Sequence, residues 1–423
     1  MRMNLKAIFV LAAVVLVAMF SLAIVSGTIA AAFPTEFFTD NGGVELGGSA
    51  FENIKFVKNV MIWFMLMLVA FLMIFIKKYE WGVALAVLLS AAGSFIVYFF
   101  IHDFLLGDAW NQDLMLMGVI CAITVVIAIG CFLGTLKMWQ YLFVGILFAF
   151  VFVVVEWFMF GIGDIAPAVS SMFPAATAGV SDAGGSMLVH MCAAYFGLGV
   201  AIAVREKRAF AEPMYTTTHS VSFVWLAAML LWVLWPAFVT ALLPAEQVFA
   251  GMMVCYMGGI GSVVSAWAVC TAIQKKVNPL IYTYAMLAGP VAIGTPLIFI
   301  GPWGAIVVGI LAGIISALSF IYLQPWLCKK LGAVDVMGVH NLHGVAGWFG
   351  ALVGVLLIAM NASEAEGMGF AALANLTGAI FVFAATLILG ILVGLILKLT
   401  RGKFPDEKMF SDDADFIKNE APV

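Results

Sequence analysis

The sequence predicts an all-α integral membrane protein with twelve transmembrane helices, on the strength of its composition, its apolar runs and its charge distribution. Of its 423 residues, 65% are hydrophobic and only 10% are charged, and the mean hydropathy is +1.15. A soluble domain of this length does not have such a composition, whereas a polytopic membrane protein does. A net charge of −4 also argues against nucleic-acid binding.

Apolar runs of the length that crosses a bilayer, about 20 residues, occur twelve times. They cover residues 7–33, 57–76, 80–101, 114–136, 138–162, 183–204, 219–243, 247–273, 279–300, 303–325, 337–360 and 370–398. The first run follows the basic start "MRMNLK", so a signal peptide cleaved near "GTIAAAF" is an alternative to a retained span. Because this run is longer than the core of an ordinary signal peptide, we expect a retained span.

Basic residues concentrate on one side of these spans. If the N-terminus is cytoplasmic, all but two of the 19 Lys and Arg residues lie in cytoplasmic segments, and the exceptions are Lys55 and Lys58. The opposite loops, such as "HDFLLGDAWNQD" and "NASEAEG", are acidic or neutral. By the positive-inside rule, this bias predicts a multi-pass protein of the cell membrane with both termini in the cytoplasm. Residues 1–400 then form one membrane domain, followed by an acidic cytoplasmic tail at 401–423.

The sequence contains an internal repeat. "DAGGSMLVHMCAAYFG" at 182–197 and "DVMGVHNLHGVAGWFG" at 335–350 share Asp, Gly, His, an aromatic residue, Phe and Gly at equal spacing. In the expected topology the two stretches enter the membrane from opposite faces. They therefore indicate an inverted five-plus-five repeat, approximately 57–204 and 219–360, with a C-terminal helix at 370–398.

The histidines of this repeat, His190 and His343, lie eight residues after their aspartates. Eight helical residues rise about 12 Å, which places both imidazoles near the middle of a ~30 Å apolar core. One buried histidine is commonly explained by an interhelical hydrogen bond. Two at equivalent places of an inverted repeat favour a transport path, where a pair can share a proton and still offer hydrogen bonds to a small passing molecule.

The aspartates of the repeat, Asp182 and Asp335, precede their helices, so we expect them chiefly to cap free helix N–H groups. Asp182 could also stabilise a cation at an external entrance. His340 lies one turn from His343, and together with His190 it could suggest a metal site. No carboxylate or thiol lies at comparable depth, however, so no metal or other cofactor is expected.

Together these residues resemble the Rhesus (Rh) branch of the Amt/Rh ammonium transporter family. The paired stretches are similar to its twin-histidine helices, and "WPAF" at 235–238, "LAGPVAIGT", "GIISALSFIYLQPWL" and "PDEKMF" also look Rh-like. The extra N-terminal span fits Rh proteins better than eleven-helix ammonium transporters.

The resemblance implies a homotrimer with one pore in each subunit. Ammonium would be recruited at an external vestibule and lose its proton, and neutral NH3 would cross past His190 and His343. By the same likeness, Phe238 closes the external side of the pore and Glu156 is a vestibule carboxylate that raises the local ammonium concentration. Core packing is the plain alternative for Phe238, and a protonated interhelical hydrogen bond is the alternative for Glu156.

The sequence departs from the family pattern at Ile120, which occupies the usual place of a first gate phenylalanine. A cation–π contact at the entrance would then be missing. This leaves CO2, or both NH3 and CO2, as an alternative cargo. A non-conducting ammonium sensor or membrane assembly subunit is an alternative from another class. No nucleophile elbow, phosphate loop or metal cluster supports an enzyme.

Overall fold

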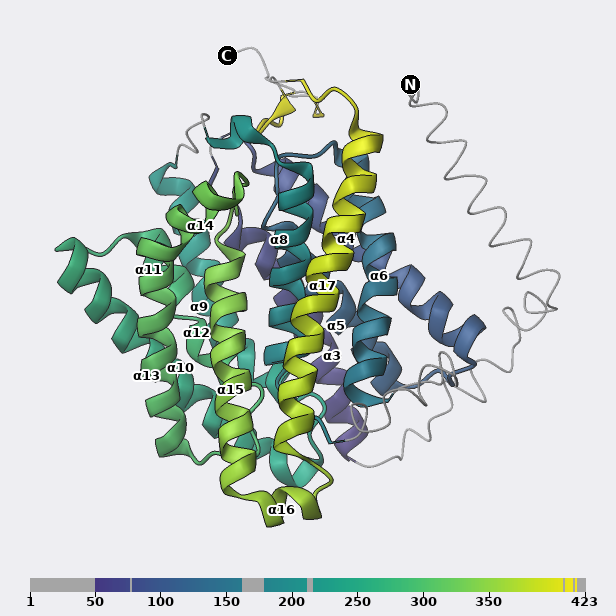
Figure 1. Ribbon diagram of the computed structural model, residues 1–423, viewed down its shortest axis with the longest axis vertical. Coiled ribbons are helices and arrows are strands. Elements are labelled where there is room, and N and C mark those ends of the chain that lie inside the picture. Colours follow the sequence, from purple (N-terminus) through teal and green to yellow (C-terminus); the bar gives the residue numbers. More distant parts are fainter. Residues whose placement is uncertain are drawn as a thin grey trace.

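The computed structural model describes residues 50–76, 78–161, 179–210, 216–405, 408–413 and 415–416. The span expected at 7–33 lies outside these residues, as do the whole of residues 1–49 and of residues 162–178. Within the described residues the regular structure is helical, and most helices run roughly along the long axis of one bundle (Figure 1).

The first half of the bundle comprises the elements up to Phe210. They are α3 (Ala50–Leu72), α4 (Trp81–Phe100), η2 (Ile101–Leu106), α5 (Gln112–Ile129), α6 (Met138–Phe160), η3 (Ser186–Met191), α8 (Cys192–Val204) and η4 (Lys207–Phe210).

The second half runs from Thr218 to Arg401. Its elements are α9 (Thr218–Val239), α10 (Ala245–Gln274), α11 (Pro279–Ala285), α12 (Ala288–Ala292), α13 (Pro302–Leu318), η5 (Ser319–Leu323), α14 (Gln324–Leu331), η6 (His340–Gly344), α15 (Val345–Met360), α16 (Ala362–Gly367) and α17 (Ala372–Arg401).

Ten stretches within the described residues are long and apolar enough to cross a membrane, and each matches a predicted span. The run at 279–300 differs, because it consists of the short helices α11 and α12 and a series of turns. Its sequence "LAGPVAIGTP" explains the break, since glycine and proline disfavour a continuous helix. The all-α membrane fold is thus confirmed, while the N-terminal span at 7–33 stays a prediction.

Small residues allow helices of the bundle to pack in close contact. A Cβ on Gly309 of α13 would lie 1.9 Å from the Gly258 carbonyl oxygen of α10. A Cβ on Gly390 of α17 would likewise lie 2.3 Å from the Phe196 carbonyl oxygen of α8. Side chains at these positions would force the helices apart, so these glycines set the helix spacing in the manner common to membrane bundles.

One end of the bundle carries the described residues of the C-terminal tail (404–405, 408–413 and 415–416) and is called the tail end; the opposite end carries α16 and is called the α16 end (Figure 1). The tail is fastened at Asp412, whose carboxylate accepts hydrogen bonds from the backbone N–H groups of Glu80 (2.9 Å), Trp81 (3.0 Å) and Gly82 (2.7 Å). These groups start α4 and have no intrahelical acceptor. The tail therefore supplies the N-terminal cap that α4 lacks locally.

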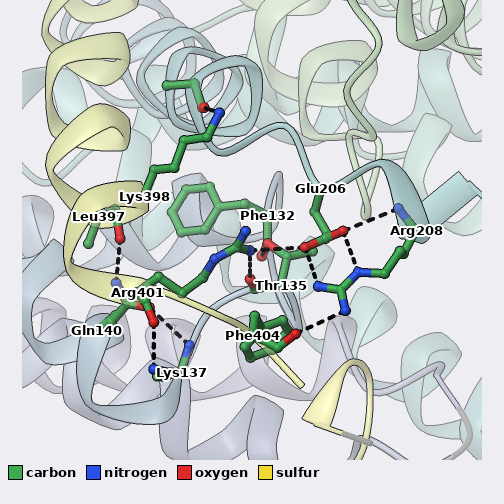
Figure 2. Close-up of polar contacts among 11 residues, drawn as sticks. Phe132, Thr135, Lys137, Gln140, Glu206, Arg208, Leu397, Lys398, Arg401 and Phe404 are labelled. Carbon is green, nitrogen blue, oxygen red and sulfur yellow. Dashed lines mark hydrogen bonds and ion pairs between the residues drawn. The ribbon is translucent and has the colours of Figure 1, made fainter. Parts of the chain in front are cut away.

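A second fastening joins α8, α17 and the tail around Glu206 (Figure 2). The Glu206 carboxylate accepts hydrogen bonds from the Arg208 guanidinium at 2.8 and 2.6 Å and lies 3.2 Å from Arg401 Nη1. Arg401 also donates to the Thr135 carbonyl (2.7 Å), and Arg208 donates to the Phe404 carbonyl (2.9 Å). The hydrogen bonds from Arg208 are the main reason that the pKa of Glu206 lies below its ordinary value.

Candidate functional site

The site begins with two helices that start in the same unusual way. Asp182 accepts hydrogen bonds from the N–H groups of Met187 (3.0 Å) and Leu188 (2.8 Å), and Gly185 turns the chain at a φ of 75°. A positive φ is accessible to glycine at little cost, which explains the residue at this turn. The Thr295 hydroxyl also donates to Asp182, at 2.6 Å. Burial raises the pKa of Asp182 to about 7, against the opposing effect of these hydrogen bonds.

Asp335 repeats this arrangement at the tail end. It accepts from the N–H groups of Val339 (3.0 Å) and His340 (2.9 Å), and Gly338 has a φ of 67°. Burial raises the pKa of Asp335 to about 6. In both cases the cap is followed by a short π-helical segment, η3 or η6, which changes the direction of the side chains that follow.

These two segments bring His190 and His343 together in the interior of the bundle. Their Nδ1 atoms are 3.0 Å apart, and the rings are stacked at 23° with centroids 5.0 Å apart. A hydrogen bond between two Nδ1 atoms requires one imidazole to donate and the other to accept. The accepting neutral ring then carries its proton on Nε2. His190 Nε2 is buried and has no hydrogen-bond partner among the described residues.

A cavity of about 50 Å³ adjoins both imidazoles. A water-sized molecule needs roughly 10–15 Å³ of such volume, so the cavity has room for a few small molecules. Apart from the two histidines, its lining is apolar or aromatic. The lining residues are Met65, Val69, Leu72, Met73, Ile123, Ile127, Val189, Leu231, Trp235, Phe238, Tyr284, Leu287, Met337, Val339 and Leu342.

Phe238 lies beside the pair, with its ring centroid 6.0 Å from that of His190. It belongs to α9, in which Pro236 interrupts the regular hydrogen bonding. Trp235, one turn before Phe238, has its ring 5.7 Å from His190 and also lines the cavity. Trp235 was not predicted as a site residue, although it is the first residue of the "WPAF" stretch.

Ile120 and Glu156 occupy different surroundings. Ile120 is buried in α5 but is not among the cavity-lining residues, which from this helix are Ile123 and Ile127. Glu156 is 1% exposed and accepts a hydrogen bond from the Tyr98 hydroxyl at 3.0 Å. Its other oxygen lies 3.6 Å from His102 Nε2.

His102 was missed by the sequence analysis. It stacks on Tyr98, and its Nδ1 lies 2.7 Å from the Asp108 carboxylate, so it connects that loop residue with Glu156. Its sequence context, "YFFIHDF", gives no spacing that links it to Glu156.

The remaining histidine of the repeat, His340, is separate from the cavity lining. Its ring makes an edge contact with Tyr195 at 5.6 Å, and its Nδ1 is buried without a partner among the described residues. Among the residues that the structure describes, no cluster of three or more His, Cys, Asp and Glu residues has the geometry of a metal site.

Several known proteins are similar to this chain in sequence and in fold. Residues 46–419 match the model of the Ammonium Transporter Family. Rh type A ammonium transporter from Mus musculus is 32% identical over 360 residues, which cover 81% of this chain and 76% of that protein. Rh type C from Rattus norvegicus is 28% identical, over 81% of this chain and 72% of that protein.

Solved structures agree with this match. Rh50 from Nitrosomonas europaea superposes with a TM-score of 0.79 at 29% identity, covering 89% of this chain and 94% of that chain. A sensor Amt protein has a TM-score of 0.70 at 18% identity, covering 86% and 97%, which shows the shared fold alone.

The fold and the site therefore define a multi-pass membrane protein with a paired polar group inside a narrow apolar cavity. The chain belongs to the ammonium transporter family, and its similarity to Rh type A, Rh type C and Rh50 places it in the Rhesus branch.

Proposed function

We propose that this protein is an ammonia channel that takes up ammonium at one membrane face, removes its proton and conducts neutral NH3 past His190 and His343. The observation that carries the proposal is the pair of imidazoles, 3.0 Å apart, on an otherwise apolar cavity. The named activity of its Rh-type relatives supports the same cargo.

The chemistry of the lining favours a neutral molecule. An ammonium ion loses its hydration on entering an apolar passage, and the cost is several kcal/mol or more for an unpaired charge. NH3 needs only hydrogen-bond partners, and His190 Nε2 is available as one. The imidazoles therefore lower the barrier for NH3 without supplying the fixed negative charge that a cation needs.

The remaining residues of the path are assigned as follows. Phe238 forms the gate on the external side, and Asp182 positions its helix and stabilises a cation at that entrance. Ile120 occupies the usual place of the first gate phenylalanine, and Glu156 raises the ammonium concentration near the mouth. The α16 end is external by the charge bias, both termini are cytoplasmic in the cell membrane, and the subunits form a homotrimer with a pore in each.

A stopped-flow assay on proteoliposomes tests the function. Vesicles loaded with a pH dye are mixed with an ammonium salt, and entry of NH3 makes the lumen alkaline. We expect alkalinisation faster than in protein-free vesicles. Equal rates in the two kinds of vesicle would reject an ammonia channel.

Carbon dioxide is the second candidate cargo, favoured by the apolar lining of the cavity. CO2 is apolar and does not depend on a hydrogen-bond acceptor to the extent that NH3 does. In the same vesicles, CO2-driven acidification above the protein-free rate, which persists when His343 is replaced by Leu, would assign a CO2 or dual path.

A non-conducting sensor is the alternative from another class. It would bind ammonium without transporting it, so ammonium would raise the melting temperature of the protein while the vesicle rates stayed at the protein-free level. A proposal of catalysis finds no support, since the family is one of transporters.

A further inference from the structure

Lys58 is a buried cation that the proposed mechanism does not use. It lies on α3 and is 6% exposed. It is one of the two basic residues on the side of the membrane that the charge bias predicts to be external. Burying an ammonium group costs several kcal/mol unless it is well paired, so this position calls for an explanation.

The Lys58 ammonium is held by a backbone carbonyl. Its Nζ donates a 2.6 Å hydrogen bond to the Thr240 carbonyl oxygen, and no carboxylate pairs with it within the described part of the chain. Thr240 is the C-cap residue of α9 and directly follows its last residue, Val239. The carbonyl groups at a helix C-terminus carry partial negative charge and bind cations, so this is a site with the chemistry that ammonium itself would use.

The position of this site relative to the cavity follows from the two helices. Thr240 comes two residues after Phe238, which lines the cavity. Lys58 lies seven residues, or about two turns, before Met65, which also lines the cavity, so the two side chains share one face of α3. The ammonium group is therefore expected on the α16 side of Phe238 and Met65, although Lys58 and Thr240 are not themselves among the lining residues.

Lys55 provides a contrast on the same helix. Its Nζ lies 2.9 Å from the Asp113 carboxylate, which is 57% exposed. A paired charge near solvent is largely neutralised and screened. Lys58 is thus the basic side chain of α3 whose positive charge acts on the mouth of the cavity.

We propose that Lys58 determines specificity at the mouth: its tethered ammonium occupies the carbonyl site at the end of α9 and repels free cations, so that neutral molecules enter the cavity in preference to NH4+. This rests on the proposed function, because it concerns which species enters the same passage. Ammonium gathered in the vestibule would then enter the cavity only after it has lost its proton.

The experiment compares Lys58→Met and Lys58→Gln, both uncharged, with Lys58→Arg, which keeps the charge. Each purified variant is reconstituted in liposomes, and the ammonium concentration that gives half of the maximal initial rate of alkalinisation is measured. If the two charges are taken to be about 8 Å apart, with an effective dielectric constant of about 20, a unit charge changes cation occupancy roughly thirtyfold. We therefore expect Met and Gln to lower the half-saturating ammonium concentration about tenfold or more, and Arg to leave it near the wild-type value.

Lys55→Met is the matched control, and we expect it to change this concentration less than about threefold because its charge is paired and screened. If the lysine acted only by bonding Thr240, Gln would keep the hydrogen bond and behave like wild type, which would overturn the proposal. Loss of folding in both Met and Gln variants would also overturn it in favour of a structural role.

Alkalinisation of the same vesicles separates this proposal from the function on which it rests. Wild-type alkalinisation above the protein-free rate, with unchanged half-saturation in the uncharged variants, would reject the role of Lys58 alone. Absence of wild-type alkalinisation would reject the ammonia channel itself.

Discussion

At the scale of single residues, polar side chains in the interior fall into those that hold helices and those that face the cavity. Asp182 and Asp335 accept backbone N–H groups at the starts of η3 and η6, whereas His190 and His343 bond to each other beside the cavity. The spacing of the repeat was sufficient to predict both pairs, because a helix fixes the distance from a cap to a residue eight positions on.

Other contacts of the site could not be predicted at this scale. The bond between Lys58 and Thr240 joins residues 182 positions apart, and that between Tyr98 and Glu156 joins residues 58 apart. Neither pair has a repeat or a motif that links its members. Such contacts depend on how α3 meets α9 and α4 meets α6, which hydropathy does not encode.

Asp182 gives a prediction at this scale. Asp182→Ala leaves two helix N–H groups and the Thr295 hydroxyl without their acceptor. Loss of a cap costs about 1–2 kcal/mol, with more for each buried group left unsatisfied. We expect a clearly lower melting temperature in detergent, measured by intrinsic fluorescence.

Asp182→Asn is the control, since it keeps an acceptor oxygen and should recover most of the stability. If the Ala variant melted at the wild-type temperature, Asp182 would not be a cap of consequence.

At the scale of helices, hydropathy and length were sufficient for ten long spans, and each is found in the structure. The broken segment at α11 and α12 was expected to be one helix. Hydropathy averages over such a run, whereas the break depends on the local turns at 286–287 and 293–299, on either side of α12. The place where the tail docks was not predicted, because nothing in its acidic sequence singles out the start of α4 as its partner.

The tail gives a second prediction. Asp412→Ala removes the acceptor for three N–H groups at the start of α4, a loss of about 1–2 kcal/mol. Released from this contact, residues 404–416 should be cut faster by a protease in a limited-digestion time course. Asp415→Ala serves as the control, because its pairing with Lys408 is partly exposed. Equal cutting of both variants would contradict the capping role.

The Glu206 cluster gives a prediction about pH. Hydrogen bonds from Arg208 hold the pKa of Glu206 below its ordinary value, so the charged form stabilises the folded protein. This stability is present above the ordinary glutamate pKa of about 4.3 and is lost as the pH falls through the lower, folded-state pKa. Glu206→Gln should therefore lower the melting temperature at pH 7, and the difference from wild type should shrink as the pH falls below about 4. A difference independent of pH would contradict this account.

At the scale of the whole molecule, the glycine contacts of α10 with α13 and of α8 with α17 hold these helices close to one another. We infer from the matching caps of η3 and η6 that residues 57–204 and 219–360 are inverted repeats of one membrane domain. In that arrangement each repeat supplies one imidazole, and the passage lies between the repeats. The composition and the charge bias predicted the membrane class at this scale, whereas most of the side chains that line the cavity could be identified only from the packing.

The most direct test of the central claim is the rate of ammonium-driven alkalinisation in proteoliposomes that hold wild type or His343→Leu. Leucine fills a similar space but removes the imidazole, and loss of one hydrogen-bond partner in a dry passage costs roughly 1–3 kcal/mol, or about 5- to 150-fold in rate. The account predicts that the folded variant falls to or near the protein-free rate, with wild type well above it. A folded His343→Leu protein that alkalinises vesicles as fast as wild type would contradict the account.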